Sequence, residues 1–358
     1  MHKTGNSPGD SHPLSDAEKR RLASRIATDQ DAPAIRDLLE QAIGLQETAA
    51  ALRAEFLNWK YWDPHPLASE PRSFVLTAGS ALAAHAGAWP VLLEGNHPTA
   101  HAIHLIDWIA SQRIPGAGVK VLSFAQAKAD AVFSIGGSAM TRKMLPLMRF
   151  QPVNMIWFLQ RALRPFGAVL RDSPRDWKMP ARLLRGLLQY ATPRDRLGAA
   201  WSTQQVSVQQ IPAGLFPKAE MGEAVAARTA EYLAYISRCP LFRQTRTYLL
   251  VRDGEPVAYF LLAAVGTQVR LIDFGPNRLD EASATALGIA AQTVARVDFA
   301  FCHDITMGST EESVIAGMKA AGLRANGAEV IHVRKLRGAL SDVDRFRMTL
   351  LDWDAACL

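Results

Sequence analysis

Cysteine is scarce in this sequence, and its spacing excludes several kinds of site. The 358 residues contain three cysteines, Cys239, Cys302 and Cys357, which lie far apart and form no CxxC pair. An odd and sparse set of cysteines argues against a disulfide framework and a cysteine-ligated zinc site, and it is typical of a reducing compartment. We therefore expect free thiols, no metal and a cytoplasmic location.

Long apolar runs and a secretion signal are missing as well. No stretch approaches the roughly 18 uninterrupted apolar residues of a spanning helix. Residues 1–21 are polar and lack the apolar region of a signal peptide, so we expect a disordered leader there. Hydrophobic residues nevertheless make up 49% of the chain and charged residues 21%, which indicates a globular protein with a full core. The length is sufficient for two domains of ordinary size.

The positive charge is concentrated in the middle of the chain. From Arg142 to Arg196, twelve Lys or Arg stand against three Asp, a net charge of +9, whereas the whole chain carries +6. This region is either a solvated, arginine-rich linker or a surface for anionic lipid, acidic polymer or phosphate groups. It has no interleaved aromatic pattern, so we expect no nucleic-acid partner. We expect a basic helical linker over 151–212, with an apolar helix at 155–170 and an amphipathic helix at 181–191. Either helix packs on the domains or lies on a membrane interface, the second case giving peripheral membrane contact through 155–196.

The same order of elements occurs twice along the chain. Leu105-Ile-Asp-Trp108 and Leu271-Ile-Asp-Phe274 occupy equivalent places, each after a strand hairpin and before a helix. A repeated element order with a repeated tetrapeptide predicts an internal duplication. We therefore expect one domain over 22–150 and a second over 213–358. The periodicity predicts first-half strands at 73–79, 81–95, 101–109 and 129–135 and helices at 116–128 and 138–148; the second half has strands in 247–266, 269–276, 298–305 and 328–336 and helices at 280–297 and 310–323.

A candidate anion-binding loop follows the strand at 101–109. Arg113-Ile-Pro-Gly116-Ala-Gly118 opens the next helix. Glycines allow the backbone to approach a phosphate closely, and the unpaired amides of a helix start point at its oxygens. In the second half the corresponding stretch is Gly275-Pro-Asn-Arg278 followed by an acidic helix start, which would repel a pyrophosphate.

Arg113-x-x-Gly116-x-Gly118 and Phe56-x-x-Trp59-Lys-Tyr61 resemble motifs of the GNAT (GCN5-related N-acetyltransferase) superfamily, in particular its tandem-domain bacterial members. The resemblance implies an α/β (α+β) fold of two tandem GNAT-like domains, each a mixed, mostly antiparallel sheet flanked by helices. It also implies one site for acetyl-CoA or another acyl-CoA in the first half, the second half being a degenerate copy. The cofactor-binding residues would be Ile109, Arg113, Gly116, Ala117, Gly118 and Val119.

Acyl transfer to an amine requires a base, and Asp107 and His104 are the catalytic candidates. Strand alternation places them on opposite faces, so they can share a cleft only if a bulge intervenes. The alternatives are that Asp107 caps a turn or binds an arginine, and that His104 belongs to the core. Trp59, Tyr61 and His85 are candidate substrate-binding residues, with packing as the alternative.

These features together predict an acyl-CoA-dependent N-acyltransferase that acts on a small or sugar-linked amine, with an anionic acceptor in envelope or exopolysaccharide metabolism as the favoured case. The chain departs from the family at Pro115, which removes an amide donor from the loop, and at Leu145, where the usual tyrosine acid is missing. The alternative is therefore an inactive pseudo-acetyltransferase that binds CoA or a partner protein. We expect a monomer or a homodimer.

Overall fold

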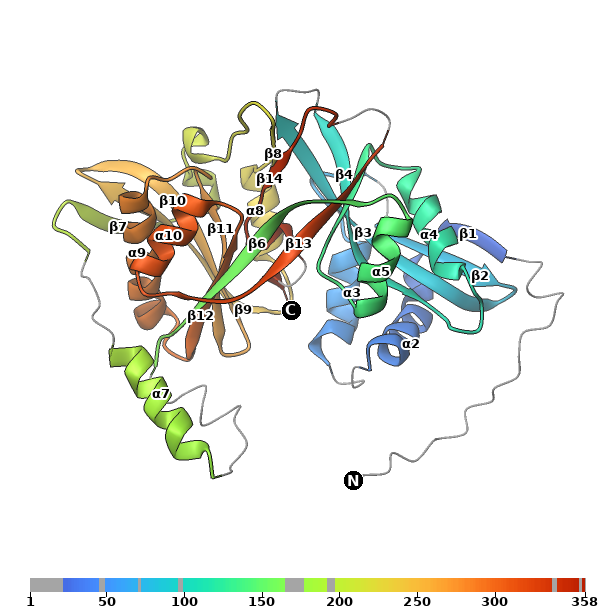
Figure 1. Ribbon diagram of the computed structural model, residues 1–358, viewed down its shortest axis with the longest axis horizontal. Helices are drawn as coiled ribbons and strands as arrows, with labels where there is room; N and C mark the ends of the chain where they lie inside the picture. Colours follow the sequence, from blue (N-terminus) through green and yellow to red (C-terminus); the bar gives the residue numbers. More distant parts are fainter. Residues whose placement is uncertain are drawn as a thin grey trace.

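Two similar sets of strands join edge to edge into one long mixed sheet (Figure 1). The structure is a computed structural model, and it describes residues 22–44, 49–69, 72–95, 99–164, 177–191, 197–336, 340–353 and 356–357. Within these ranges the strand order is β1-β2-β3-β4-β5-β13-β6-β12-β11-β10-β9-β7. The predicted fold class, a tandem pair of mostly antiparallel sheets with flanking helices, is confirmed.

The first set forms the N-terminal half. Its strands pair antiparallel except for β4 and β5, which are parallel because helix α4 connects them. The strands are β1 (Leu22–Ile26), β2 (Ser73–Ala78), β3 (Ala81–Gly95), β4 (Ala100–Ala110) and β5 (Ala131–Ile135), and the helices are α2 (Ala32–Ile43), α3 (Ala54–Tyr61), α4 (Ala117–Gln126) and α5 (Ala139–Leu147).

The second set repeats this plan. β11 and β12 are again a parallel pair connected by a helix, α9. The expected strand at 298–305 starts later than the sequence suggests, because α9 continues to Asp298 and β12 begins at Asp304. The elements are β7 (Trp201–Val206), α8 (Ala230–Ser237), β9 (Phe242–Arg252), β10 (Glu255–Val265), β11 (Gln268–Gly275), α9 (Glu281–Asp298), β12 (Asp304–Ser309) and α10 (Glu312–Ala320).

The two halves exchange their closing strands. β6 (Gln151–Ala162) follows the first set in sequence but pairs with β12 of the second. β13 (Arg324–Lys335) follows the second set but pairs with β5 of the first. The two exchanged strands also pair with each other. In Figure 1 they run side by side from one half to the other. Neither half therefore completes its sheet without a strand from the other.

The expected helix at 155–170 is wrong for its first part, because residues 151–162 form β6. Buried Leu159 and Arg161 alternate with the more exposed Phe158, Gln160 and Ala162, which is the period of a strand. The second expected helix is confirmed as α7 (Met179–Ala191), where Leu184 and Leu187 are exposed. Residues 165–176 and 192–196 lie outside the described ranges. Membrane contact through 155–196 and the domain limits at 150 and 213 stay predictions.

Three buried apolar clusters hold the sheet and its helices together. One lies under α4 and α5, and a second lies under α9 and α10. The third, which we call the shared core, lies on the opposite face and contains side chains of both halves, such as Trp59 and Tyr235, whose rings stack at 5.3 Å. Burial of this apolar surface stabilises the contact between the halves.

A short strand pair also connects the halves. β8 (Glu223–Ala226) pairs with β3 of the N-terminal half and with β14 (Arg345–Arg347). The Glu223 carboxylate accepts hydrogen bonds from Arg347 Nε at 2.5 Å and from Arg278 Nη2 at 2.8 Å. Burial raises the pKa of Glu223, but the hydrogen bonds from the two arginines outweigh it and lower this pKa to about 2.

We expect the Glu223 network to make stability depend on pH in the acid range. A carboxylate whose pKa is depressed in the folded state stabilises the protein above its unfolded pKa of about 4.5, and this contribution is lost as the pH falls toward 2. Urea denaturation at pH 7, 4.5 and 3 should show a smaller loss of unfolding free energy in Glu223→Gln than in the natural protein. Glu255→Gln, at an exposed carboxylate outside this network, is the control. Equal pH dependence in Glu223→Gln and the natural protein would contradict this expectation.

Candidate active site

A bulge in β4 sets the position of Asp107. Its backbone has φ of 45°, a left-handed conformation that is uncommon for any residue other than glycine. The pairing of β4 with β3 shifts register at the same place, between the pairs His85–Ile109 and Gly87–Ile106. The extra residue of a bulge reverses which side chains face which side of the sheet.

The clusters on the two faces show this reversal. Before the bulge, Ala102 and Ile106 belong to the shared core, whereas after it Ile109 packs there and Trp108 packs toward α4. Ile106 and Asp107 therefore face the same side although they are adjacent in sequence. This is the bulge that strand alternation requires if Asp107 and His104 are to share a face.

Two side chains of α3 bind the Asp107 carboxylate. Lys60 Nζ lies 2.6 Å from Oδ2, and the Tyr61 hydroxyl donates a hydrogen bond to the same oxygen at 2.5 Å. The Asp107 carbonyl accepts a hydrogen bond from His85 Nδ1 at 3.1 Å. Because a carbonyl can only accept, His85 carries its proton on Nδ1, and Nε2 accepts from the Ser73 hydroxyl at 2.9 Å. Backbone and side chain of Asp107 are thus both fixed.

The Asp107 carboxylate is held in its ionised form. Burial raises its pKa, but the charge of Lys60 and the hydrogen bonds from Lys60 and Tyr61 outweigh burial and lower the pKa below its ordinary value. The Asp107 side chain is 13% exposed and the Lys60 side chain 5%. An ionised carboxylate with one accessible side can bind and orient an ammonium group.

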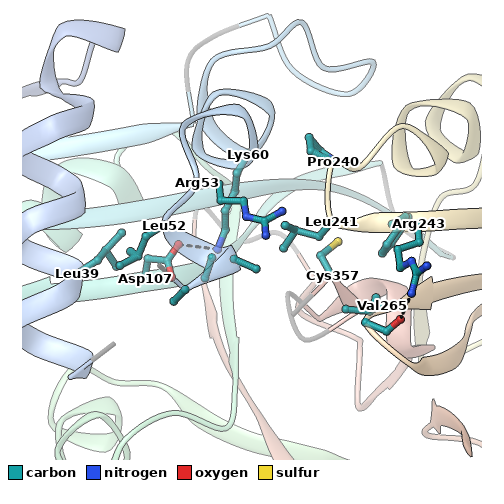
Figure 2. Close-up of a pocket in the computed structure, with 15 residues that line it drawn as sticks. Leu39, Leu52, Arg53, Lys60, Asp107, Pro240, Leu241, Arg243, Val265 and Cys357 are labelled. Atoms are coloured by element: carbon teal, nitrogen blue, oxygen red, sulfur yellow. Dashed lines mark hydrogen bonds and ion pairs between the residues drawn. The ribbon is translucent and has the colours of Figure 1, made fainter. Parts of the chain in front are cut away.

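The accessible side of Asp107 opens into a cavity of about 600 Å³ between the two halves. Figure 2 shows Asp107 and Lys60 on one wall, with Arg53 beside them and Arg243 on the far side. The volume is in the range of a small-molecule site. The remaining lining residues are Leu39, Ala49, Ala50, Ala51, Leu52, Pro240, Leu241, Phe242, Val265, Gly266 and Cys357.

The other predicted site residues on the shared-core face are buried and do not line the cavity. Tyr61 and His85 are fully buried and contact Asp107. His104 is 2% exposed and stacks on Phe133 at 4.8 Å, and burial lowers its pKa to about 3, so it is neutral at physiological pH. Trp59 packs on Tyr235. These contacts fix Asp107 and the core, and a direct role for the four residues in catalysis or substrate binding stays a prediction.

The predicted anion loop follows the C-terminal end of β4, whereas β4 pairs with β5 near its N-terminal end. Gly116 has φ of 80° and is the N-cap of α4, a backbone conformation that suits glycine. Gly118 and Val119 belong to the first helical turn, whose amides have no partner one turn back in the helix. The Gly118 carbonyl accepts a hydrogen bond from Trp108 Nε1 at 2.8 Å, which ties the helix start to β4 next to Asp107. Arg113 and Pro115 are exposed, whereas Ile114 anchors the loop in the core under α4.

β4 and β5 separate just before the bulge. They pair only from Ala102–Ala131 to His104–Phe133, although β4 continues to Ala110. The β5-facing edge of β4 from Leu105 onward is therefore not paired with β5. Its backbone groups are available to an extended ligand, as at any unpaired strand edge. This edge leads from Ile109 to the anion loop.

The C-terminal half contains the same bulge with a different environment. The pairing of β11 with β10 shifts register at Ile272. Ile272 and Asp273 therefore both face the shared core. Asp273 is fully buried and accepts hydrogen bonds from Tyr259, Thr349 and Arg228. Arg228 also binds Asp352 at 2.8 Å. The carboxylate of the second copy is thus fully paired within the protein and is not accessible to a ligand.

The helix start after β11 is also occupied. Asp280 is the N-cap of α9, and its side chain accepts a hydrogen bond from the Ser283 amide at 2.6 Å. A carboxylate already occupies the place where an anionic ligand would bind. The start of α9 thus differs from the start of α4, where Gly116 is the N-cap. A single acyl-CoA site in the N-terminal half stays a prediction.

Sequence reasoning missed three cationic residues of the cavity. Lys60 was part of a recognised motif without a role, because its contact with Asp107 depends on how α3 packs over β4. Arg53 and Arg243 gave no signal, because they come from opposite halves and meet only at the cavity. In the described part of the chain, no group of three or more His, Cys, Asp or Glu could hold a metal ion. No helix of that part combines the length and apolarity needed to cross a bilayer.

No protein-family model and no curated protein sequence matches the chain. Solved structures do match it over most of its length. N-myristoyltransferase of Saccharomyces cerevisiae with bound myristoyl-CoA has a TM-score of 0.57 at 12% identity and covers 92% of this chain and 82% of its own. A tandem GNAT protein from the clavulanic acid biosynthesis pathway has a TM-score of 0.55 at 11% identity and covers 88% and 98%. A GCN5-related N-acetyltransferase from Anabaena variabilis has a TM-score of 0.54 at 10% identity and covers 89% and 74%.

These comparisons define the class of fold. At identities near 10% a structural match shows the fold alone. The chain has the tandem GNAT fold, as its motifs and its duplicated element order predict.

Replacing Arg228 should be costly, because it leaves Asp273 and Asp352 as buried and uncompensated charges. Loss of one partner from a buried ion network costs about 3–5 kcal/mol, and we expect Arg228→Met to lower the free energy of unfolding by this amount in chemical denaturation. Arg252→Met removes a half-exposed guanidinium whose pair with Asp253 is worth only about 0–1 kcal/mol. Similar losses in the two variants would show that the network does not stabilise the second copy.

Proposed function

We propose that this protein is an acyl-CoA-dependent N-acyltransferase that binds acyl-CoA in its N-terminal half and the acceptor amine in the cavity between the halves. The observation that carries the proposal is the place of Asp107. On one side its carboxylate faces the cavity, and on the other its strand runs along an unpaired edge into the anion loop. A donor on the strand edge and an acceptor in the cavity would meet at this residue.

The backbone of the anion loop supports a donor site in the N-terminal half. Arg113 and the amides of Gly116, Ala117, Gly118 and Val119 would bind the pyrophosphate of acetyl-CoA or another acyl-CoA. Ile109 would pair with the pantetheine arm along the free edge of β4. The bound myristoyl-CoA of the Saccharomyces cerevisiae structure supports an acyl-CoA as the ligand of this fold.

The reaction needs little more than position and a base. The amine nitrogen attacks the thioester carbonyl, the N–C bond forms and the C–S bond breaks. Asp107 accepts a proton from the nitrogen, and of the two protons that the acceptor ammonium loses, one ends on the CoA thiol and one is released. An unpaired β4 amide polarises the carbonyl during attack. The acceptor class proposed from the sequence, a small or sugar-linked amine of envelope or exopolysaccharide metabolism, is part of this proposal.

One observation favours a second candidate, an inactive pseudo-acetyltransferase that binds CoA or a partner protein. Leu145 is fully buried in the core under α4 and α5, so it offers no phenol to protonate the leaving thiolate. Binding of acyl-CoA without turnover would support this second candidate.

Donor binding is tested by thermal unfolding with and without acetyl-CoA. A ligand that binds only the folded state raises the melting temperature, and we expect such a rise in the natural protein. Arg113→Glu should abolish it, because the substitution places negative charge at the pyrophosphate. Lys128→Glu makes the same charge change just beyond the other end of α4 and should keep the rise. An unchanged rise in Arg113→Glu would place the donor elsewhere.

Turnover is tested by release of free thiol from acetyl-CoA in the presence of a panel of amines. Asp107→Asn keeps the size of the side chain but removes the ionised acceptor, so we expect the rate to fall roughly 10²- to 10⁴-fold. The melting-temperature rise with acetyl-CoA should persist, which separates a lost base from a lost donor site. A full rate in Asp107→Asn would remove Asp107 from the mechanism.

A further inference from the structure

Positive side chains outnumber negative ones among the described residues that line the cavity. Its charged lining residues are Arg53, Lys60, Arg243 and Asp107. Lys60 and Asp107 neutralise each other at 2.6 Å, so the two guanidinium groups remain as an excess of about two positive charges. Within the ranges that the structure describes, neither guanidinium has a carboxylate partner. Among the described lining residues, the cavity therefore has an excess of positive charge around one carboxylate that is already paired.

Local structure holds both arginines at the cavity. Arg53 lies between the 3-10 turn Ala50–Leu52 and α3, where it is the N-cap residue with extended ψ of 138°. The Arg243 guanidinium lies 4.3 Å from the centre of the Phe301 ring, and its Nη1 is 3.5 Å from the Gly266 carbonyl. Figure 2 shows the two side chains entering from opposite halves, with Leu241 and Cys357 between them.

The rest of the wall is apolar. Leu39, Leu52, Leu241, Phe242 and Val265 supply most of it. Such a wall suits a ligand with an apolar body and charged ends. It does not suit a polyamine, because each further ammonium group would need a carboxylate and would be repelled by the arginines.

We propose that the acceptor is a primary amine that also carries a carboxylate or phosphate group, with its amine at Asp107 and its acidic group at Arg53 and Arg243. This inference rests on the proposed function and specifies the substrate class of the same cavity. Both arginines present the planar fork that binds carboxylate and phosphate through paired hydrogen bonds.

The test compares matched amines in the thiol-release assay. Leucine, leucinamide, phosphoethanolamine and spermidine vary the acidic group while each keeps a primary amine. We expect kcat/KM for leucine or phosphoethanolamine to exceed that for leucinamide and spermidine at least tenfold, and the preferred one of the two identifies the acidic group. Equal or better use of leucinamide or spermidine would overturn the proposal.

Variants assign this preference to the two arginines. Arg53→Ala and Arg243→Ala should each raise KM about tenfold for the preferred acidic amine, with little change for leucinamide and no change in the acetyl-CoA melting-temperature rise. Arg246→Ala, at an exposed arginine of the same strand as Arg243, is the control and should change neither. Unchanged KM in both cavity variants would overturn the proposal.

If no amine releases thiol, the proposed function fails, and calorimetric binding of the same four compounds decides the acceptor class separately. Binding of an acidic amine that is weakened in Arg53→Ala and Arg243→Ala would support the acidic site in a protein without turnover. Absence of binding by either acidic amine would overturn the acidic site as well.

Discussion

The ion pair between Lys60 and Asp107 is the interaction on which the candidate site depends. A left-handed backbone at a non-glycine residue costs about 1–3 kcal/mol and persists only where its surroundings fix it. Here Lys60 and Tyr61 hold the carboxylate, and His85 holds the carbonyl. Without the bulge, the alternation of β4 would turn Asp107 toward α4, and the described lining of the cavity would lose its carboxylate.

The strand exchange explains why a cavity between two halves can be a defined site. A cleft between independent domains changes its width as the domains move. Here β6 and β13 each complete the other half's sheet, and the shared core packs Trp59 of one half on Tyr235 of the other. Opening the cleft would break backbone pairing and expose apolar surface together. Arg53 and Arg243 thus line the same cavity although they are distant in sequence.

Patterns local to one segment were predictable, and contacts between segments were not. The repeated Leu-Ile-Asp tetrapeptides correctly indicated a duplication, since both copies form the same bulge at the same strand. The residues 151–162 carried a mixed apolar pattern that favoured a helix, because nothing in that stretch shows that a strand from 324–335 will pair with it. Lys60 could be recognised within a motif, but its role depends on α3 lying over β4. Arg53 and Arg243 were invisible for the same reason, since a cavity belongs to the packing and not to either segment.

The two copies of the bulge show how a duplicated carboxylate can serve two different purposes. Asp107 has one cation and one hydroxyl as partners and keeps 13% of its side chain exposed to a cavity. Asp273 has Arg228, Tyr259 and Thr349, and Asp352 shares Arg228, so no side of the carboxylate is exposed. The helix that follows each strand also differs in its N-cap residue, which is Gly116 for α4 and Asp280 for α9. One copy therefore combines an accessible carboxylate with a helix start open to an anion, whereas the other satisfies both internally. The register shift is present in both copies, whereas the left-handed backbone occurs at Asp107 and not at Asp273. The strained conformation therefore accompanies the copy whose carboxylate is accessible.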